Sequence, residues 1–310
     1  MNFIEQSCLP YLRNAQNEDG GWGFMPGAGS RVEPTAWALI ALHEFASASS
    51  SEKAVSNAAS FLKKVQLPDG SWPAALGQHS GSWVTSLACW SLLFSRQFES
   101  SLEKGLQWLG KELPGDSLTL WKIIRKLTAG GREAIQDDSF SGWSWTPGTA
   151  SWVEPTSYAI IALRKGTKSP PPKLNQRLHM AKSMLYDRMC PAGGWNCGNP
   201  MVYGVAGEPQ VGPTVWALLA LQEDFAKPKI QESLNWLEHN AAGLQSPGSL
   251  ALTHIALHLA GRTYAAAKLL PRIYDENNEV LWNVPVAAWS ALTATKHNWL
   301  SVTLPNGGTR

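Results

Sequence analysis

Two kinds of hydrophobic segment alternate along the chain. In the first kind, apolar residues recur every three or four positions, which is the spacing of one face of an α-helix. In residues 52–66, Val55, Ala58, Leu62 and Val65 follow this spacing, and charged side chains lie elsewhere. Six segments of this kind predict helices with one buried face: 2–16, 52–66, 101–112, 173–189, 228–240 and 264–276.

Segments of the second kind are apolar on nearly every side, so we expect helices that are buried all round. Four of them begin with the pattern Thr-x-x-Ala, headed by Thr35, Thr85, Thr156 and Thr214. We expect these threonines to cap the helix N-termini, and the proline before three of them suits a helix start. The predicted segments are 32–45, 83–94, 152–165, 211–224, 249–261 and 284–294.

This alternation predicts an all-α protein with the architecture of an (α/α)6 toroid. Because the wholly apolar helices need neighbours on every side, we expect them to form an inner ring that the one-sided helices surround. One further helix near 117–128 falls outside this count and is expected to cover one end of the ring. No change in composition divides the core, so residues 1–310 are predicted to form a single domain.

A short motif, Gln-x-x-Asp-Gly-Gly/Ser-Trp, occurs at 16–22 and again at 66–72. Each copy lies between a predicted outer helix and the following inner helix. We expect its glycine to adopt a positive φ, its aspartate to accept backbone N–H groups in the turn, and its glutamine to reach a neighbouring helix. The sequence Gly-Gly-Trp at 193–195 looks like a third copy that lacks the glutamine and aspartate.

Composition narrows the function. The chain of 310 residues has 26 basic and 24 acidic side chains and no block of like charge, which argues against a nucleic-acid partner. Four widely spaced cysteines and a start without a signal-peptide pattern favour reduced thiols and a cytoplasmic location. The 16 tryptophans indicate heavy structural use of indole rings or an aromatic cavity.

The repeated motif and the paired helices resemble the QW repeats of the superfamily of squalene–hopene cyclases, oxidosqualene cyclases and protein prenyltransferases. This resemblance implies a toroid with a central apolar cavity that holds an isoprenoid chain. Class II terpene cyclases carry Asp-x-Asp-Asp-Thr at the head of one inner helix, and its middle aspartate donates a proton. The chain has Trp-Val-Glu-Pro-Thr at 152–156, so the resemblance implies Glu154 as the proton donor. Glu33 occupies the same place in an earlier repeat, and Pro155 departs from the family pattern.

A carboxyl group that protonates a C=C bond must be neutral and must lie in a dry pocket. A glutamate at a helix start has an alternative use, because it also stabilises the N-terminal end of the helix dipole. A second acidic candidate is the pair Asp137 and Asp138, which matches the tail of the acidic motif. These aspartates lie in a polar loop, and a solvated or capping role is the alternative there.

Aligning the repeated threonines also identifies candidate aromatic side chains. Trp37, Tyr158 and Trp216 each lie two residues after one of these threonines. Others crowd the entry to the inner helix at 152–165. We expect them to stabilise a carbocation through cation–π attraction, with helix packing as the alternative. The predicted substrate-binding side chains are Trp37, Trp143, Trp145, Trp152, Tyr158, Trp216, His254 and His258.

The leading hypothesis is therefore a terpene cyclase-like enzyme that begins the cyclisation or isomerisation of an isoprenoid with an acid. The first alternative is a non-catalytic toroid that binds an apolar isoprenoid or a partner protein, because the acidic motif is incomplete. Glycoside hydrolysis also stays open if Glu33 and Glu154 face each other. A homodimer, a partner subunit and peripheral contact with a membrane stay open as well.

The third hypothesis is a zinc-dependent prenyltransferase or peptide-modifying enzyme. Its candidate ligands are Asp187, Cys190, Cys197, His254 and His258. The prenyltransferases use an Asp-x-Cys pair, and the lanthionine cyclases, another family of zinc toroids, use an adjacent Cys-His pair. Both pairs are absent from this sequence. We therefore expect no metal and no other cofactor.

Overall fold

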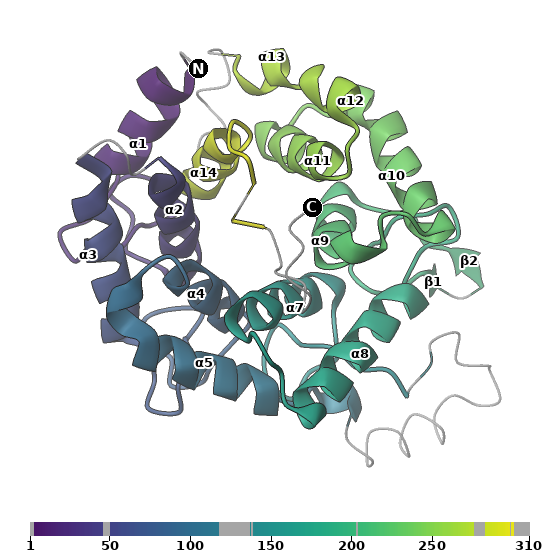
Figure 1. The fold of residues 1–310 in the computed structure, drawn as a ribbon, viewed down its shortest axis with the longest axis horizontal. Helices are drawn as coiled ribbons and strands as arrows, with labels where there is room; N and C mark the ends of the chain where they lie inside the picture. Colours follow the sequence, from purple (N-terminus) through teal and green to yellow (C-terminus); the bar gives the residue numbers. More distant parts are fainter. Residues whose placement is uncertain are drawn as a thin grey trace.

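The computed structural model describes residues 3–45, 50–117, 137, 139–202, 204–275, 283–297 and 299–300. In this part of the chain the helices form two concentric rings (Figure 1). The inner ring consists of α2 (Val32–Glu44), α4 (Val84–Leu92), α7 (Val153–Gly166), α9 (Val211–Ala220), α11 (Pro247–Leu259) and α14 (Val284–Leu292). The outer ring consists of a π-helical turn (Ile4–Cys8) that continues into α1 (Leu9–Asn14), then α3 (Ser50–Val65), α5 (Glu99–Lys111), α8 (Pro172–Asp187), α10 (Pro228–Asn240), α12 (Thr263–Ala267) and α13 (Leu270–Ile273).

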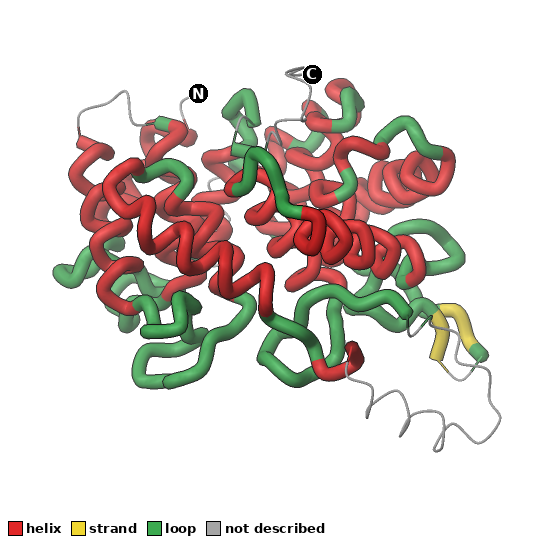
Figure 2. Tube along the Cα trace, turned by 60° about the horizontal axis from the view of Figure 1, so that its bottom comes forward, coloured by secondary structure: helices red, strands yellow, loops and turns green. Residues whose placement is uncertain are grey.

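Short elements join these helices. Single 3-10 turns span Arg96–Phe98, Gly115–Ser117, Gln222–Asp224 and Ala241–Gly243. A small antiparallel hairpin pairs β1 (Met201–Val202) with β2 (Val205–Ala206), with Met201 opposite Ala206. Most of the long loops lie along one edge of the ring (Figure 2).

The inner ring closes on itself. Helix α2 contacts α4, and the contacts continue through α7, α9, α11 and α14 back to α2. The prediction of a helical toroid is therefore confirmed. The further helix expected near 117–128 lies almost wholly outside the described residues.

Burial follows the two sequence patterns. In α2, every residue from Pro34 to Leu42 is buried, as the unbroken apolar run predicts. In α5 the buried residues are Ser101, Gly105 and Leu109, which are spaced by four and mark a single face. Each inner helix therefore packs on every side, whereas an outer helix loses only one face to the core.

Four loops fasten an outer helix to the next inner helix in the same way. A tryptophan backbone N–H donates to a threonine hydroxyl at 2.9 Å, and the indole N–H of the same tryptophan donates to a carbonyl of the preceding outer helix at 2.6–3.0 Å. These bonds satisfy buried polar groups between the rings. The fastening units are Trp22 with Thr35, Trp72 with Thr85, Trp143 with Thr156 and Trp195 with Thr214.

The prediction that these threonines are N-caps was wrong. Thr35 is the fourth residue of α2, and its hydroxyl donates to the Arg31 carbonyl at 2.6 Å while accepting the Trp22 N–H. A threonine hydroxyl inside the first turn can serve a carbonyl four residues back and a partner outside the helix at once. The threonine therefore links the helix to the preceding turn instead of ending the helix.

The predicted roles of the Gln-x-x-Asp-Gly motif are confirmed. Gln66 donates to the carbonyl oxygens of Gly70 and of Ser101 in the next outer helix, and Gln16 makes the equivalent pair of bonds. Gly70 has a φ of 93°, and a Cβ there would lie 2.7 Å from the Lys104 carbonyl oxygen. The aspartate of each motif accepts the N–H two residues ahead. The motif therefore joins neighbouring helix pairs around the ring.

One outer helix differs from the prediction. The segment 264–276 was expected to form one helix, but the structure has α12 and α13 with a break at Lys268 and Leu269. Pro271 follows the break and has no N–H to donate to the preceding turn, so the helix cannot continue unchanged.

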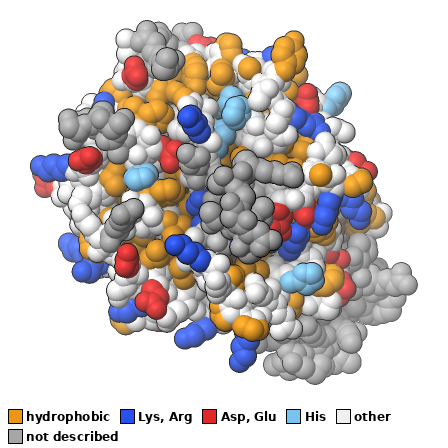
Figure 3. All heavy atoms as spheres, viewed as in Figure 1, with side chains coloured by type: hydrophobic (Ala, Val, Ile, Leu, Met, Phe, Trp, Pro, Cys, Tyr) orange, Lys and Arg blue, Asp and Glu red, His pale blue; other side chains and the backbone are white. Residues whose placement is uncertain are grey.

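Basic and acidic side chains are intermixed on the face of the ring seen in Figure 3, without a continuous patch of one charge. This distribution agrees with the near balance of charges in the sequence. Among the described residues, every helix is too short or too polar to cross a lipid bilayer.

Candidate functional site

The inner helices begin at one end of the ring, which we call the mouth. The second residue of α2, α7, α9, α11 and α14 lies at this level, and Trp83 holds the matching place two residues before Thr85. We call these six residues the carboxyl layer: Glu33, Trp83, Glu154, Gly212, Gly248 and Pro285.

Glu33 and Glu154 are the two ionisable members of the carboxyl layer. Burial raises the pKa of Glu154 to about 7. Burial, and then repulsion from Glu154, raise the pKa of Glu33 to about 7. Among the described residues, neither carboxyl group has a hydrogen-bond or ion-pair partner. The pair can therefore hold a proton near neutral pH without a basic side chain beside it.

The carboxyl of Glu154 faces an open position on the neighbouring helix. A Cβ at Gly212 would lie 3.5 Å from Glu154 Oε1, which is ordinary van der Waals contact. A methyl group would therefore fit between Gly212 and this carboxyl.

One helical turn deeper, the sixth residue of the same helices forms a second level, with Leu87 in the matching place on α4. At about 1.5 Å per residue, the two levels are about 6 Å apart. Tyr158 belongs to this level, and burial followed by the charges of Glu154 and Glu33 raises its pKa. We call these residues the floor layer: Trp37, Leu87, Tyr158, Trp216, Leu252 and Trp289.

The floor layer closes the bore of the ring. Trp37 and Trp216 come from α2 and α9, which lie on opposite sides of the inner ring (Figure 1), yet their ring centroids are 5.3 Å apart. Trp289 packs on Trp37 at 5.7 Å, and Tyr158 packs on Trp216 at 4.8 Å. The resemblance implied a hollow centre. At this level that expectation was wrong, because indole rings from opposite helices meet across the axis.

Further indoles fill the bore below the floor layer. The segment after α14 turns into the centre of the ring (Figure 1) and places Trp299 against Trp90, with ring centroids 5.6 Å apart. Trp90 donates its indole N–H to the Trp299 carbonyl at 2.9 Å, and Gln222 donates to the Leu300 carbonyl at 3.0 Å. These contacts fill the bore below the floor layer, on the side away from the carboxyl pair.

Aromatic side chains also surround the mouth. Trp83 packs edge-on against Trp145 at 4.9 Å and stacks with Tyr158 at 5.5 Å. Trp152 precedes α7, and the backbone N–H of Val153 donates to the Cys197 carbonyl in the neighbouring loop at 3.1 Å. The carboxyl pair is thus bordered by Trp83 and Trp145 on one side and by the loop of Cys197 on another.

Comparisons with known proteins agree with this architecture. No model of a known protein family matches the chain. The type II terpene cyclase MstE from Scytonema has a TM-score of 0.62 at 15% identity, covering 94% of this chain and 96% of that chain. The chain has the fold of the type II terpene cyclases. A variant of MstE with geranylgeranyl dihydroxybenzoate bound as its substrate gives a TM-score of 0.61 at 14% identity, covering 94% and 95% of the two chains.

One sequence relative and one further solved structure add to this comparison. A drimenyl diphosphate synthase from Streptomyces showdoensis is 25% identical over 263 residues, which cover 72% of this chain and 48% of that protein. The chain thus spans about half the length of this curated relative. An α-1,6-mannanase of Salegentibacter also has a TM-score of 0.62, at 8% identity, covering 94% and 97% of the two chains. Sequence and fold together support the predicted resemblance to terpenoid cyclases, and the toroid itself is shared with enzymes of another class.

The fold brings together six of the predicted site residues, namely Glu33, Glu154, Trp37, Trp145, Tyr158 and Trp216, but places Trp143 elsewhere. Trp143 belongs to a fastening unit, and its indole N–H donates to the Leu109 carbonyl at 3.0 Å. Arg177 lies 4.4 Å from the Trp143 ring and donates to the Gly142 carbonyl, so an arginine contacts the turn of this unit, whereas Gln16 and Gln66 contact the turns of the first two units. Trp143 therefore joins the outer ring of helices to the inner ring, and we leave it out of the proposed site.

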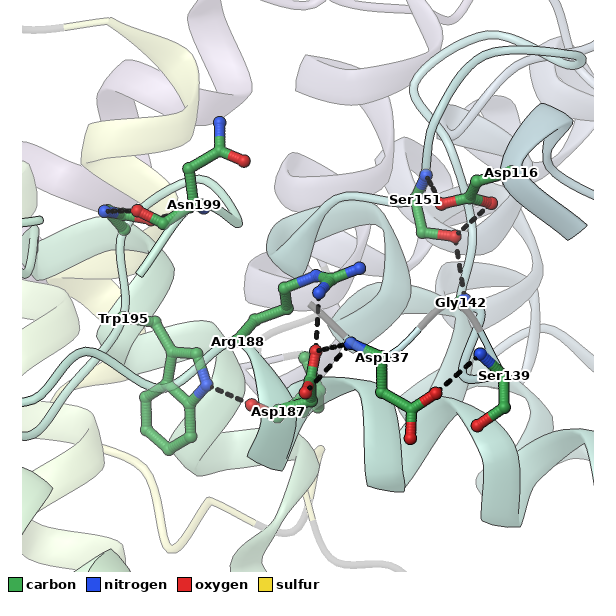
Figure 4. A network of polar contacts seen from close by, with 11 residues as sticks. Asp116, Asp137, Ser139, Gly142, Ser151, Asp187, Arg188, Trp195 and Asn199 are labelled. Carbon is green, nitrogen blue, oxygen red and sulfur yellow. Dashed lines mark hydrogen bonds and ion pairs between the residues drawn. The ribbon is translucent and has the colours of Figure 1, made fainter. Parts of the chain in front are cut away.

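The acidic pair in the loop also lies outside the mouth. Asp137 is exposed, and Figure 4 shows it in a network with Ser139 and Asp187 near the end of α8. Its carboxylate accepts the Ser139 N–H at 2.8 Å, and its own N–H lies 3.3 Å from the Asp187 carboxylate. Asp138 lies outside the described residues. Asp137 thus closes a surface turn beyond the ring of inner helices.

The predicted histidines lie toward the end of the ring opposite the mouth. Both nitrogens of His254 face backbone carbonyls, those of Ala266 at 2.9 Å and Thr293 at 3.2 Å. His258 is exposed one turn later, and His297 packs on it at 4.9 Å. His254 therefore packs between α11, α12 and the end of α14, and both of its ring nitrogens already have partners.

The candidate zinc ligands do not converge. Cys190 is buried, whereas Cys197 is exposed and lies 3.5 Å from the side chain of Gln210. Within the described ranges, no group of three or more His, Cys, Asp or Glu side chains could hold a metal ion. The residues named for the zinc hypothesis therefore do not fit a metal site.

Some residues of the site went unnoticed in the sequence. Trp83 stands two residues before Thr85, as Glu33 stands before Thr35, so aligning the repeats would have found it. Trp289 was missed because Ala287 stands where the other repeats have the threonine that precedes the aromatic residue by two positions. Trp299 comes from a segment without helical periodicity, and the sequence holds no signal for its place in the bore.

Proposed function

We propose that the chain catalyses an acid-initiated cyclisation or isomerisation of an isoprenoid at the mouth. The observation that carries this proposal is the pair of partly buried carboxyls, Glu33 and Glu154, one turn above an indole floor. Carboxyl groups with raised pKa values in a dry, concave site are suited to proton donation. The sequence relative and the fold support the same reaction class.

The two carboxyls take different roles. Glu154 is the proton donor: its O–H bond breaks as a C–H bond forms on the alkene carbon, which leaves a carbocation on the neighbouring carbon. A second alkene of the same chain attacks this cation and closes a ring. The final cation loses a proton to a carboxylate, so the overall reaction is an isomerisation. Glu33 in its ionised form stabilises the positive charge and returns the proton, as in other sites that set two carboxyls apart.

The walls suit such a cation. Indole and phenol faces attract positive charge by about 0.5–2 kcal/mol per contact, more where water is excluded. Trp83, Tyr158, Trp216 and Trp289 present rings around and below the carboxyl layer. These rings would exclude water from the cation.

The carboxyl pair favours an uncharged substrate end. Among the described residues, no Lys or Arg pairs with Glu33 or Glu154, so an anionic group placed beside them would meet only repulsion. An alkene or an epoxide carries no such penalty. Any charged group of the substrate is therefore expected to lie away from these carboxyls.

Matched glutamine variants test the proposal. Wild type, Glu154→Gln, Glu33→Gln and the exposed-site control Glu52→Gln are incubated with squalene, farnesyl diphosphate and geranylgeranyl diphosphate, and products are identified by mass spectrometry. We expect cyclised product from wild type and control, and a loss of at least about 100-fold in Glu154→Gln. Equal product from Glu154→Gln would remove its role as donor, and an isoprenoid that binds without turnover would favour the non-catalytic alternative.

Glycoside hydrolysis is the second candidate, because a mannanase shares the toroid and two carboxyls suit that reaction. The floor layer opposes it, since a sugar needs several polar partners and Tyr158 carries the single hydroxyl among the indoles and leucines of that layer. Release of reducing ends from α-1,6-mannooligosaccharides by wild type but not Glu154→Gln would establish this alternative.

A further inference from the structure

The depth of the site is fixed by the distance between its two layers. The carboxyl layer and the floor layer are one helical turn apart, about 6 Å. Trp37 and Trp216 span the bore at the floor, and Trp90 and Trp299 support them from below. All four indoles are almost completely buried, so the support is continuous.

We infer that the contact pair Trp37–Trp216, whose rings meet across the bore, sets the length of the isoprenoid chain that the site accepts. The inference rests on the proposed function and names the residues that select among its substrates. A chain that places its reactive double bond at Glu154 meets the indole pair within one turn. Longer chains must bend toward the mouth or stay partly in water, so their additional methylene groups add little to the affinity.

The rest of the floor layer shows what a smaller side chain would do. Leu87 and Leu252 hold the matching places on α4 and α11, so the fold already accepts leucine at this level. The Trp37 indole N–H is buried and has no hydrogen-bond partner within the described part of the chain, and its ring is held by contacts with other rings. Replacing Trp37 with leucine therefore opens the bore without leaving a hydrogen-bond partner unsatisfied.

The test measures binding and needs no turnover. Geraniol, farnesol and geranylgeraniol are titrated against wild type, Trp37→Leu and Trp216→Leu, with native mass spectrometry as the readout. Trp236→Leu, on the outer helix α10, is the matched control. Circular dichroism and urea unfolding verify the fold, and Trp37→Phe replaces any leucine variant that does not fold.

We expect the ratio of geranylgeraniol to geraniol affinity to rise at least about tenfold in both floor variants, because burying about two more methylene groups is worth that much. The control should keep the wild-type ratio. An unchanged ratio in folded floor variants, or no binding of any alcohol, overturns the inference. A shifted ratio with no effect of Glu154→Gln on turnover would instead reject the proposed function and leave the length selection standing.

Discussion

Removing one carboxyl from the mouth should stabilise the protein at high pH and leave it almost unchanged at low pH. Glu154 has an ordinary pKa of 4.5, which burial raises to about 7 in the folded protein. A carboxyl with a raised pKa binds its proton more tightly in the folded state than in the unfolded chain. The protonated Glu154 therefore contributes favourably to the free energy of unfolding below pH 4.5, and this contribution is lost as the pH rises through about 7. Above that range the folded protein must hold a partly buried negative charge.

The magnitude follows from the pKa change. Raising one carboxyl pKa from 4.5 to about 7 corresponds to about 3 kcal/mol of folding free energy. Solvent screening at the mouth lowers this to about 2 kcal/mol, because Glu154 is not fully buried. The neutral amide in Glu154→Gln keeps the shape of the side chain and avoids this penalty. It also relieves the repulsion that helps raise the pKa of Glu33.

The assay is urea unfolding followed by tryptophan fluorescence at pH 5 and pH 8.5. We expect Glu154→Gln to unfold with a free energy about 2 kcal/mol above wild type at pH 8.5, and within about 0.5 kcal/mol of it at pH 5. Glu52→Gln, on the exposed side of α3, should follow wild type at both values. The reasoning is refuted if wild type has the same stability at both pH values, or if the variant gains equally at both.

Three further changes separate fold from site. Gln66→Ala removes two hydrogen bonds to carbonyl oxygens and should lower the free energy of urea unfolding by about 1–3 kcal/mol. Gly70→Ala should lower it by at least about 2 kcal/mol, because φ is 93° and the new Cβ would lie 2.7 Å from the Lys104 carbonyl; stability near wild type would contradict this. Gly212→Ala should raise stability by about 0.5–1 kcal/mol while lowering turnover, because it fills the space beside Glu154; unchanged turnover would show that the substrate does not use that space.

Much of the fold could be predicted because the burial of each helix is visible as a pattern of hydrophobic residues in the sequence. A helix packed on all sides has no polar stripe, and a helix packed on one side has a stripe every three or four residues. The segments at 249–261 and 284–294 had no threonine header, yet their apolar composition alone identified α11 and α14. The break between α12 and α13 was missed because short helices keep the same spacing.

The site was harder to predict because contacts between helices on opposite sides of the ring produce no periodic pattern in the sequence. Glu33 and Glu154 were found from their equivalent places before Thr35 and Thr156, and the structure couples them electrostatically. Nothing in the sequence placed Trp216 against Trp37 across the axis, since each residue simply follows its own helix. The identity of a floor residue is visible in the sequence, but the closure of the floor depends on the diameter of the ring.

Each repeat contains residues that hold the ring together and a position that does not. The fastening tryptophan and threonine make backbone and hydroxyl bonds that the ring requires, so they are the same in four units. The position two residues before the threonine makes no such bond, and there the chain has Glu33, Trp83, Glu154 and Gly212. A change at that position alters the mouth without loosening the ring. An α-1,6-mannanase shares the toroid at 8% identity, so the ring itself does not specify a reaction, and the proposed chemistry depends on the side chains at these positions.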